Sequence, residues 1–247
     1  MGELEGKVVL ITGGSRGLGE QMAHAFAGEG AGIIVASRKL DNCVKVADEI
    51  SGRYGVRAFP AAFNVSDWAQ CDELIAAAYD AFGRVDVLIN NAGLSPLYPS
   101  LDVVSEALFD KVIAVNLRGP FRLTAVIGTR MAAGTGGTII NIGSVEAIRP
   151  HVSALPYAAA KAGLNVLTEG FAQAFGPKVR VNAIQCGAFL TDIAKNWDDG
   201  IQEDMEQAAA LHRVATASEI TGAALFFATS ASSFATGAVL RLDGGVR

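Results

Sequence analysis

The sequence is poor in cysteine, histidine and clustered charge, and each shortage argues against a class of function. Its 247 residues include three cysteines and three histidines, without a Cys-x-x-Cys spacing. We therefore expect no disulfide framework and no metal site. Charged residues make up 18% of the chain, the net charge is -5, and lysine and arginine form no blocks. A nucleic-acid or anionic membrane surface is not expected from such a pattern.

Long apolar runs are missing as well. No run approaches the length of a membrane span, and the acidic start of the chain does not resemble a signal peptide. We expect a cytoplasmic protein whose partners are small molecules. In contrast, hydrophobic residues reach 51% of the composition, which is typical of a chain that buries a large core. The length suits a single α/β domain over residues 1–247.

Short β-branched runs alternate with longer helical segments along the chain. The first run leads into a glycine-rich turn and a helix that extends to about Glu29, which is a βαβ opening. Seven strands are predicted: Lys7–Thr12, Gly32–Ala36, Val56–Phe63, Val85–Ile89, Thr138–Ile142, Val179–Gln185 and Ala238–Leu242. Most of them are continuously apolar, as in strands that helices cover on both faces. The sequence therefore predicts a Rossmann-like, doubly wound α/β fold with one mostly parallel, seven-stranded sheet.

The segment from about 189 to 214 departs from this alternation. It carries many charges and little apolar periodicity. We interpret it as an excursion over the carboxyl edge of the sheet that serves as a substrate lid. A solvated pair of surface helices without a role is an equally good interpretation.

A glycine-rich loop follows the first predicted strand and precedes a helix. Glycines at this point let the backbone turn tightly and approach a pyrophosphate, while the N-terminus of the helix offers free N–H groups and a partial positive charge. The strand, turn and helix context favours a nucleotide over a merely tight turn. The candidate binding residues are Gly13, Ser15, Arg16, Gly17, Leu18 and Gly19.

The second predicted strand is followed by Ser37 and Arg38. An acid that would hold the ribose 2′-hydroxyl of NAD is absent from this position. Arg38, together with Arg16 and the Ser37 hydroxyl, is instead suited to a 2′-phosphate. We therefore predict NADP(H) as the cofactor, with NAD(H) as the alternative.

Tyr157 and Lys161 stand four residues apart on an alanine-rich segment, so in a helix they share one face. A phenol with a pKa of about 10 needs roughly 4 kcal/mol to act as a base at neutral pH. An ammonium at about 4 Å supplies a similar amount at an effective dielectric of about 20. Pro156 places Tyr157 in a first helical turn, where the macrodipole favours an anion. The pair suits proton transfer, although without the other motifs a pair on a helix surface would be the simpler interpretation.

Several strings in order resemble the short-chain dehydrogenase/reductase family from about Lys7 to Gly245. They comprise the glycine loop, the Asn-Asn-Ala-Gly string at 90–93, Asn116, Ser144 and the Tyr157-x-x-x-Lys161 pair, with Asp-Gly-Gly at 243–245 near the end. The resemblance implies an oxidoreductase that interconverts a carbonyl and a secondary alcohol. It implies Tyr157 as the general acid and base, Lys161 on the nicotinamide ribose, Ser144 on the substrate oxygen, and Asn116 linking Lys161 to solvent through water.

The resemblance also implies further cofactor contacts and a homotetramer. The additional cofactor residues are Asn64, Val65, Asn91, Ala92, Gly93, Gly187 and Thr191. The chain departs from the family at two places. Asn64 stands where an aspartate usually faces the adenine, and an amide can both accept and donate there. Cys186 replaces a proline before Gly187, so the following loop is expected to be less rigid, and the thiol is either reactive or, as we favour, an inert small residue.

Substrate identity is only weakly encoded. Glu146, two residues after Ser144, motivates the hypothesis of a polar substrate such as a sugar-derived ketone. A 3-oxoacyl thioester carried by acyl-carrier protein is the main alternative, and a non-catalytic NADP-binding sensor or scaffold is a distant one. The helix from Tyr157 to about Phe175 is apolar nearly all round, which predicts a subunit interface unless the helix is wholly internal.

Overall fold

The computed structural model describes residues 2–191 and 199–246. Seven strands form one sheet in the order β3-β2-β1-β4-β5-β6-β9, and every neighbouring pair is parallel. The strands of this sheet are β1 Val8–Thr12, β2 Gly32–Ser37, β3 Ala58–Ala62, β4 Val87–Asn90, β5 Gly137–Ser144, β6 Val179–Cys186 and β9 Val239–Leu242. The predicted Rossmann-like, seven-stranded sheet is confirmed, with strand ends that differ by up to two residues.

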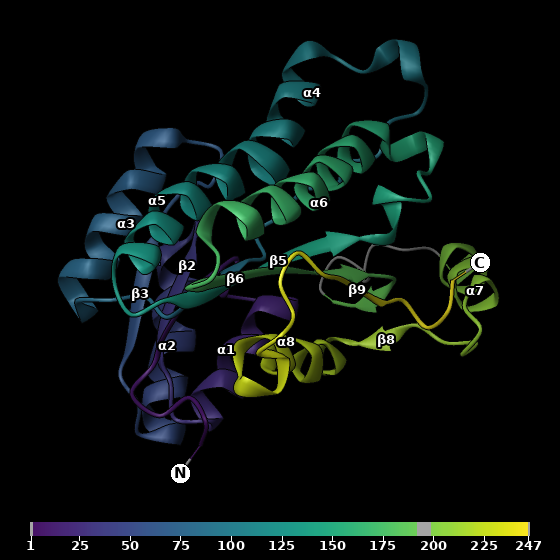
Figure 1. The fold of residues 1–247 in the computed structure, drawn as a ribbon. Coiled ribbons are helices and arrows are strands. Elements are labelled where there is room, and N and C mark those ends of the chain that lie inside the picture. The colour runs from purple at the N-terminus through teal and green to yellow at the C-terminus, as the bar shows by residue number, and fades with distance from the viewer. Residues whose placement is uncertain (1, 192–198, 247) are drawn as a thin grey trace.

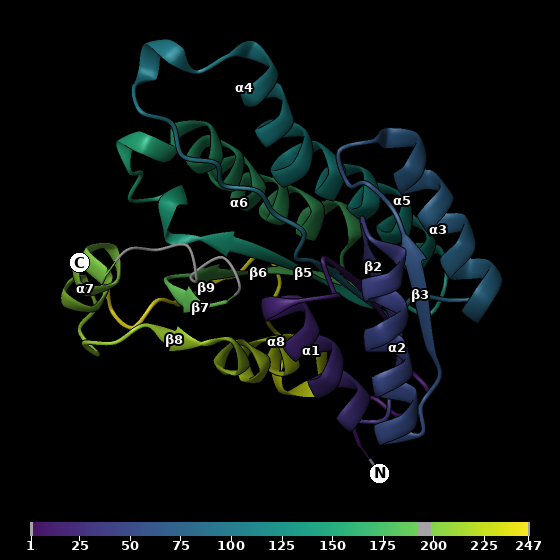
Figure 2. The ribbon, with the colours of Figure 1, turned by 180° about the vertical axis from the view of Figure 1, so that it is seen from behind.

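Helices cover both faces of the sheet (Figure 1). On one face lie α1, α2 and α8, and on the other lie α3, α5 and α6, as the reverse view also shows (Figure 2). The α-helices are α1 Gly17–Gly28, α2 Leu40–Tyr54, α3 Trp68–Phe82, α4 Glu106–Ile113, α5 Gly119–Ala133, α6 Leu155–Phe175, α7 Asp199–Ala208 and α8 Ile220–Ala228. A π-helical turn, η2, spans Ala114–Arg118 between α4 and α5. In the described part of the chain, no helix has the length and apolarity that crossing a bilayer requires.

Two cores follow from this layering. Met22 and Phe26 of α1 and Phe227 of α8 pack on one face of the sheet. Cys71 of α3 and Leu123 of α5 belong to the core on the other face. The central strands are buried along their whole length, which explains why they read as continuous apolar runs.

Two short strands that the sequence did not predict lie at the two ends of the excursion. β7 Phe189–Leu190 pairs in parallel with β8 Ala215–Thr216, so the two ends of the excursion are held together. Helix α7 lies between them, near the C-terminal end of the chain (Figure 1). Residues 192–198 of the predicted lid, including Lys195 and Asp198, lie outside the described residues.

Helix α6 is not wholly internal. Val166 leaves 71% of its surface exposed, although the helix is apolar nearly all round. The alternative of a fully buried helix is therefore wrong for this chain by itself.

Candidate active site

The parallel order of the sheet brings the carboxyl ends of its strands to one edge. The register aligns Asn90 of β4 with Asn141 of β5, and Ser144 at the end of β5 with Cys186 at the end of β6. The glycine loop follows β1 at the same edge. Ligands of open α/β sheets bind outside this edge, so the predicted site residues are well placed by topology alone.

The glycine loop folds into a cradle that side chains would fill. A Cβ on Gly19 would lie 2.2 Å from the carbonyl oxygen of Gly13, and one on Gly17 would lie 3.5 Å from the Thr191 side chain. Gly13 and Gly17 both have positive φ angles, 66° and 55°. Arg16 precedes helix α1 without a side-chain hydrogen bond that caps it. The loop thus leaves the N-terminus of α1 open to an anionic group, as a pyrophosphate requires.

Thr12 and Asn91 join the glycine loop to the strand beside it. The Thr12 hydroxyl accepts the N–H groups of Asn91 and Ala92, each at 3.0 Å. The Asn91 side-chain amide donates to the carbonyl of Thr12 at 2.9 Å and to that of Gly13 at 3.2 Å. Asn91 therefore shapes the cradle, and Thr12 is a site residue that the sequence reasoning missed. Its position directly before the glycines was the signal that could have identified it.

Ser37, at the end of β2, is tied to the glycine loop. Its hydroxyl lies 2.8 Å from the Ser15 hydroxyl and 3.1 Å from the Cys43 sulfur. The side chains of Arg16 and Arg38 are exposed nearby in the chain, one in the loop and one directly after β2. The donors predicted for a 2′-phosphate thus follow the two neighbouring strands β1 and β2.

Asn64 and Val65 follow β3 at the same edge. The N–H of Phe63 donates to the carbonyl of Ser37 at 2.9 Å, which places this loop beside the end of β2. A Cβ on Gly119, the first residue of α5, would lie 2.2 Å from the carbonyl oxygen of Val65. The loop after β3 is therefore packed closely against the start of α5.

Asn116 lies in the π-helical turn and is fully buried. Its amide nitrogen donates to the carbonyls of Leu94 and Val112 at 2.7 and 2.9 Å, and its amide oxygen accepts the Leu94 N–H at 3.1 Å. A Cβ on Gly93 would lie 3.3 Å from that oxygen. Both amide hydrogens are used, so the side chain fixes the strand that follows β4 and has no hydrogen left to donate elsewhere. Such π-turns are frequent at functional sites.

Ser144 and Tyr157 meet at the site. Ser144 ends β5, and Tyr157 lies in the first turn of α6, directly after Pro156. Burial raises the pKa of Tyr157 to about 12, a hydrogen bond from Ser144 opposes the rise, and Cys186 and Glu146 add to it. The expected lowering of the phenol pKa is thus not found in the protein without its ligands. Desolvation, which depends on the surrounding fold, outweighs the effects that the sequence suggested.

Lys161 is buried four residues after Tyr157 in α6, with 4% of its surface exposed. Its ammonium donates to the carbonyl of Ile142 at 2.7 Å and lies 5.6 Å from the centre of the Tyr157 ring. Burial lowers the pKa of Lys161 to about 8. The Lys161 ammonium is therefore still mainly protonated at pH 7. It lies on the same face of α6 as the Tyr157 phenol, as the four-residue spacing predicted.

Cys186 is an inert neighbour of this pair. The residue is buried, and desolvation raises the pKa of its thiol to about 12, although Lys161 opposes the rise. A thiol that stays protonated is a poor nucleophile. The start of the following loop is held in place, because the Gly187 N–H donates to the carbonyl of Leu242 at 3.0 Å. The backbone of Asp243 is also close, since a Cβ on Gly187 would lie 2.7 Å from the Asp243 Cα. Gly187 is thus held against the C-terminal strand and Asp243.

Tyr98 and Glu146 contact the segment that leads into α6. The Tyr98 hydroxyl donates to the carbonyl of Val152 at 2.8 Å and accepts the N–H of Leu155 at 2.9 Å. One oxygen of Glu146 accepts the N–H of His151 at 2.6 Å. Because Glu146 raises the pKa of Tyr157, its carboxylate lies within electrostatic reach of the phenol.

A buried polar network also supports the site and was not predicted. The Asn90 amide donates to Asn141 at 2.8 Å and to Thr124 at 2.9 Å, and the Asn141 amide donates to Thr168 at 2.9 Å. These contacts link β4, β5, α5 and α6 through the core. The available signal was a single asparagine in each strand, Asn90 and Asn141, directly after apolar residues.

The cradle and its donors fit a dinucleotide, and a group of potential metal ligands lies elsewhere, on α1 and α2. Within the described ranges, Glu20 and His24 of α1 and Glu49 of α2 place potential ligand atoms within 4.8 Å of one another. They lie on two helices and not among the side chains at the carboxyl edge. The prediction of no metal site therefore stays a prediction.

Comparison with known proteins gives a consistent result. The sequence profile of the short chain dehydrogenase family matches residues 7–202. A 3-oxoacyl-acyl-carrier-protein reductase from Thermotoga maritima is 35% identical over 247 residues, which is 98% of each chain. The structure is similar to that of L-sorbose reductase from Gluconobacter frateurii complexed with NADPH and L-sorbose, with a TM-score of 0.92 and 27% identity over 100% of this chain and 98% of that one.

A second similar structure shows how wide the chemistry of such proteins is. It is a 7α-hydroxysteroid dehydrogenase complexed with NADH and 7-oxo glycochenodeoxycholic acid. The TM-score is 0.93 and the identity 32%, over 98% of this chain and 95% of that one. Thioesters, sugars and steroids, and both reduced nicotinamide dinucleotides, thus occur among proteins similar to this chain.

Proposed function

The chain belongs to the short-chain dehydrogenase family of oxidoreductases, and from this premise we propose that it uses NADP(H) to interconvert a carbonyl and a secondary alcohol. The observation that carries the proposal is the meeting of Ser144, Tyr157 and Lys161 beside the glycine cradle at one edge of the sheet. When bound there, the nicotinamide supplies or accepts the hydride.

Tyr157 is proposed as the acid that protonates the carbonyl oxygen during reduction. With a pKa of about 12 its hydroxyl is fully protonated at neutral pH, so the proton is available for donation. Ser144 holds the same substrate oxygen, because its hydroxyl already bonds to the phenol. Lys161 stabilises the phenolate that remains, since its ammonium lies near the ring and is still charged at pH 7. In the reverse direction the phenolate is the base.

Lys161 and Asn116 have further proposed roles. We assign Lys161 to the nicotinamide ribose and Asn116 to the water path from Lys161 to solvent, as the family resemblance implies. The Asn116 side chain donates both of its amide hydrogens, to the carbonyls of Leu94 and Val112. We therefore propose that it supports the water path by holding the π-helical turn in place. Asn91, Ala92 and Gly93 form the floor beneath the cofactor, and Gly187 and Thr191 lie beside the nicotinamide.

The preference for NADP(H) is proposed from the donors that follow β1 and β2. Ser15 and Ser37 already share a hydrogen bond, and Arg16 and Arg38 bring two exposed guanidinium groups to the same edge. The described loops contain no carboxylate directly after β2 that would hold a 2′-hydroxyl. NAD(H) is the alternative.

For the substrate we propose a polar or sugar-derived ketone. Glu146 supports it, because a carboxylate within electrostatic reach of Tyr157 can accept hydrogen bonds from a hydroxylated substrate. The similarity to L-sorbose reductase agrees with this proposal. A 3-oxoacyl thioester is the second candidate, and the 35% identity with the Thermotoga maritima reductase favours it.

We also propose that the protein is a homotetramer or a dimer. Exposed aromatic side chains line up on one face of the molecule, with Trp68 of α3 6.3 Å from Phe121 of α5, and Phe121 5.6 Å from Phe171 of α6 between ring centres. Trp68 and Phe121 expose 41% and 39% of their surfaces. An apolar surface of this kind suits a subunit interface.

The decisive experiment follows nicotinamide absorbance with NADPH and NADH in parallel, across sugar ketones, diketones, steroids and 3-oxoacyl thioesters. We expect turnover with a hydroxylated ketone and NADPH, and a loss of about 10²- to 10⁴-fold in kcat for Tyr157→Phe, because the proton donor is removed. Tyr54→Phe, on α2, is the matched control and should keep its activity. Arg38→Leu should lower the NADPH preference.

Three outcomes would revise the proposal. Turnover of 3-oxoacyl thioesters alone would replace the substrate class. A preference for NADH that Arg38→Leu leaves unchanged would replace the cofactor. Tight binding of a dinucleotide without turnover of any compound would favour a non-catalytic sensor or scaffold.

A further inference from the structure

Helix α6 begins without a side-chain cap of its own. Its cap position is Ala154, and no side-chain hydrogen bond caps the helix from there. The first N–H groups of a helix have no partner within the helix, so they need acceptors from elsewhere. Tyr157 lies in this first turn, directly after Pro156. Whatever holds the turn therefore also holds the phenol that is proposed to donate the proton.

Tyr98, in the segment that follows β4, supplies the missing acceptor. Its hydroxyl oxygen accepts the N–H of Leu155, the first residue of α6, at 2.9 Å. The same hydroxyl donates its proton to the carbonyl of Val152 at 2.8 Å. A phenol has one proton to donate, so none is left for a substrate. The half-buried Tyr98 side chain thus holds both ends of the turn that leads into α6, although it precedes Leu155 by 57 residues.

The segment that carries Tyr98 is also held at its start. The Asn116 amide accepts the Leu94 N–H at 3.1 Å and donates to the Leu94 carbonyl at 2.7 Å. Residues 94–98 form neither helix nor strand, so the contacts at their two ends define their course. The segment therefore joins η2, where Asn116 lies, to the first turn of α6.

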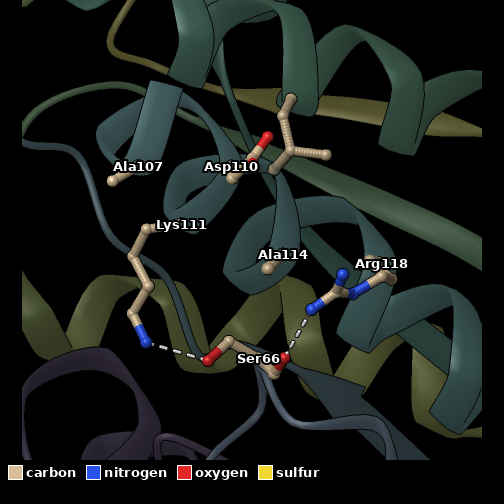
Figure 3. A pocket seen from close by; sticks show the side chains of 7 residues that line it. Ser66, Ala107, Asp110, Lys111, Ala114 and Arg118 are labelled. Carbon is tan, nitrogen blue, oxygen red and sulfur yellow. Dashed lines mark hydrogen bonds between the residues drawn. The ribbon is translucent and has the colours of Figure 1, made fainter. Parts of the chain in front are cut away.

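The π-helical turn η2 is itself bound to the loop between β3 and α3. Arg118, the last residue of η2, donates to the Ser66 carbonyl at 2.8 Å. Lys111 of α4 donates to the Ser66 hydroxyl at 2.8 Å. Figure 3 shows the two side chains reaching Ser66 from two sides. Residues 94–98 therefore start from an element that is held in place, and Tyr98 connects α6 to it.

This connection runs between the two parts of the site whose separation matters for hydride and proton transfer. Residues 91–93, directly before Leu94, form the proposed floor beneath the cofactor, and Tyr157 is two residues after Leu155. Reacting groups must be held in a near-attack geometry, and a displacement of about 1 Å can lower a rate about 100-fold. A small shift of the first turn of α6 relative to the floor is therefore expected to act on the chemical step.

We propose that Tyr98 is a positioning residue for the reaction: its hydroxyl fixes the first turn of α6 against residues 94–98, and so fixes Tyr157 relative to the bound cofactor. The inference rests on the proposed function, because it requires Tyr157 to be the proton donor. Tyr98 itself exchanges no proton with the substrate. A cap that served stability alone would leave the turnover of the folded protein unchanged, so the two roles can be separated.

Tyr98→Phe removes the hydroxyl and keeps the ring. Its kinetics are measured with NADPH and with the compound, among the sugar ketones, diketones, steroids and 3-oxoacyl thioesters, that the wild type turns over fastest. We expect kcat to fall about tenfold, while KM for that compound and Kd for NADPH stay within about twofold of the wild type. The midpoint of thermal unfolding should fall by about 2–4 °C, as for the loss of one helix cap, so the variant is folded in the assay.

Tyr79→Phe is the matched control. Tyr79 belongs to α3, and its ring packs against the Arg130 guanidinium, 4.4 Å from the ring centre. Removal of this hydroxyl leaves the turn before α6 untouched, so kcat should remain that of the wild type.

A double variant tests whether Tyr98 acts through Tyr157. Effects of residues that act as a unit are not additive. Once Tyr157→Phe has removed the proton donor, its position no longer matters. Adding Tyr98→Phe should then lower the residual kcat by less than about twofold, in contrast to the tenfold loss in the wild-type background.

Three results would overturn the inference while the proposed function stood. An unchanged kcat with a lower unfolding midpoint would make Tyr98 a cap that serves stability alone. A raised KM with an unchanged kcat would place its hydroxyl in contact with the substrate. A tenfold loss in both backgrounds would show that Tyr98 acts independently of Tyr157. Wild-type kcat for Tyr157→Phe, or no turnover of any compound by the wild type, would overturn the proposed function and this inference together.

Discussion

The side chain of Lys161 shows how a single residue is placed for chemistry at the expense of stability. The residue is 4% exposed, and its ammonium has one carbonyl partner in the described structure, Ile142. Burial lowers its pKa from 10.5 to about 8, so the charged form is disfavoured in the folded state. This difference corresponds to roughly 3 kcal/mol against folding while the group is protonated in both states.

The pH dependence of stability follows from this shift. Between pH 8 and 10.5 the unfolded chain keeps the proton that the folded chain has lost, so the free energy of unfolding rises with pH in that window. We predict that the wild type gains roughly 2–3 kcal/mol relative to Lys161→Met between pH 7.5 and pH 10.5. Urea unfolding of both proteins at the two pH values measures the difference. Parallel pH profiles would show that Lys161 is not destabilised by burial.

Activity and stability should separate in the same variant. Lys161→Met keeps most of the buried aliphatic stem but removes the charge that stabilises the phenolate, so kcat should fall about 100-fold or more. The midpoint of thermal unfolding at pH 7.5 should change little, because the desolvation cost removed offsets the lost hydrogen bond to Ile142. A lower midpoint with unchanged kcat would identify Lys161 as a structural residue.

Among the elements, the glycine loop depends on two backbones meeting without side chains between them. Gly19 lies in the first turn of α1. A Cβ on Gly19 would lie 2.2 Å from the carbonyl oxygen of Gly13 and 2.6 Å from the amide nitrogen of Asn91. A methyl group at this position must separate α1 from the loop. The element that would hold the pyrophosphate would then be displaced.

Gly19→Ala should lower the stability by about 1–3 kcal/mol, the usual cost of overpacking, and weaken dinucleotide binding by about tenfold or more. Gly52→Ala is the matched control, because a Cβ on Gly52 of α2 meets nothing within 4 Å. That change should raise the stability by up to about 1 kcal/mol, since alanine is the better helix former. Thermal unfolding and calorimetric titration with NADPH measure both effects. Equal behaviour of the two variants would contradict the close contact.

At the scale of the whole molecule, one face remains apolar in the single chain. Val166 of α6 is 71% exposed, and the aromatic row from Trp68 through Phe121 to Phe171 lies on the helices that cover the same side of the sheet (Figures 1 and 2). The opposite layer, α1, α2 and α8, also exposes apolar side chains, such as Leu40 at 48% and Phe226 at 41%, but its aromatic contacts in the described residues are isolated pairs. This asymmetry is the physical basis of the proposed oligomer.

Val166→Asp should dissociate the oligomer, because a carboxylate buried at an interface loses its hydration without gaining a partner. Leu40→Asp is the matched control: Leu40 is 48% exposed but belongs to α2 on the other face of the sheet. Light scattering coupled to size-exclusion chromatography should show a smaller assembly for Val166→Asp and an unchanged one for Leu40→Asp. A monomeric wild type at micromolar concentration would refute the proposed interface.

Much of this protein could be predicted from local sequence. The strands were visible as short apolar runs because both faces of each central strand are buried, and the helix of Tyr157 and Lys161 was set by their spacing and by Pro156. The glycine loop was recognisable because close backbone contacts such as that of Gly19 with Gly13 exclude any side chain. These features depend on neighbours along the chain, so the sequence determined them by itself.

Other features depended on residues far apart in the sequence. The pairing of β7 with β8 joins segments separated by the whole excursion, and the acceptor role of the Thr12 hydroxyl depends on Asn91 from another strand. The pKa of Tyr157 is decided by burial, and the direction of the Ser66 hydroxyl proton is decided by Lys111, 45 residues away. Desolvation and proton direction arise from whatever surrounds a group in space, and only the tertiary structure decides those surroundings.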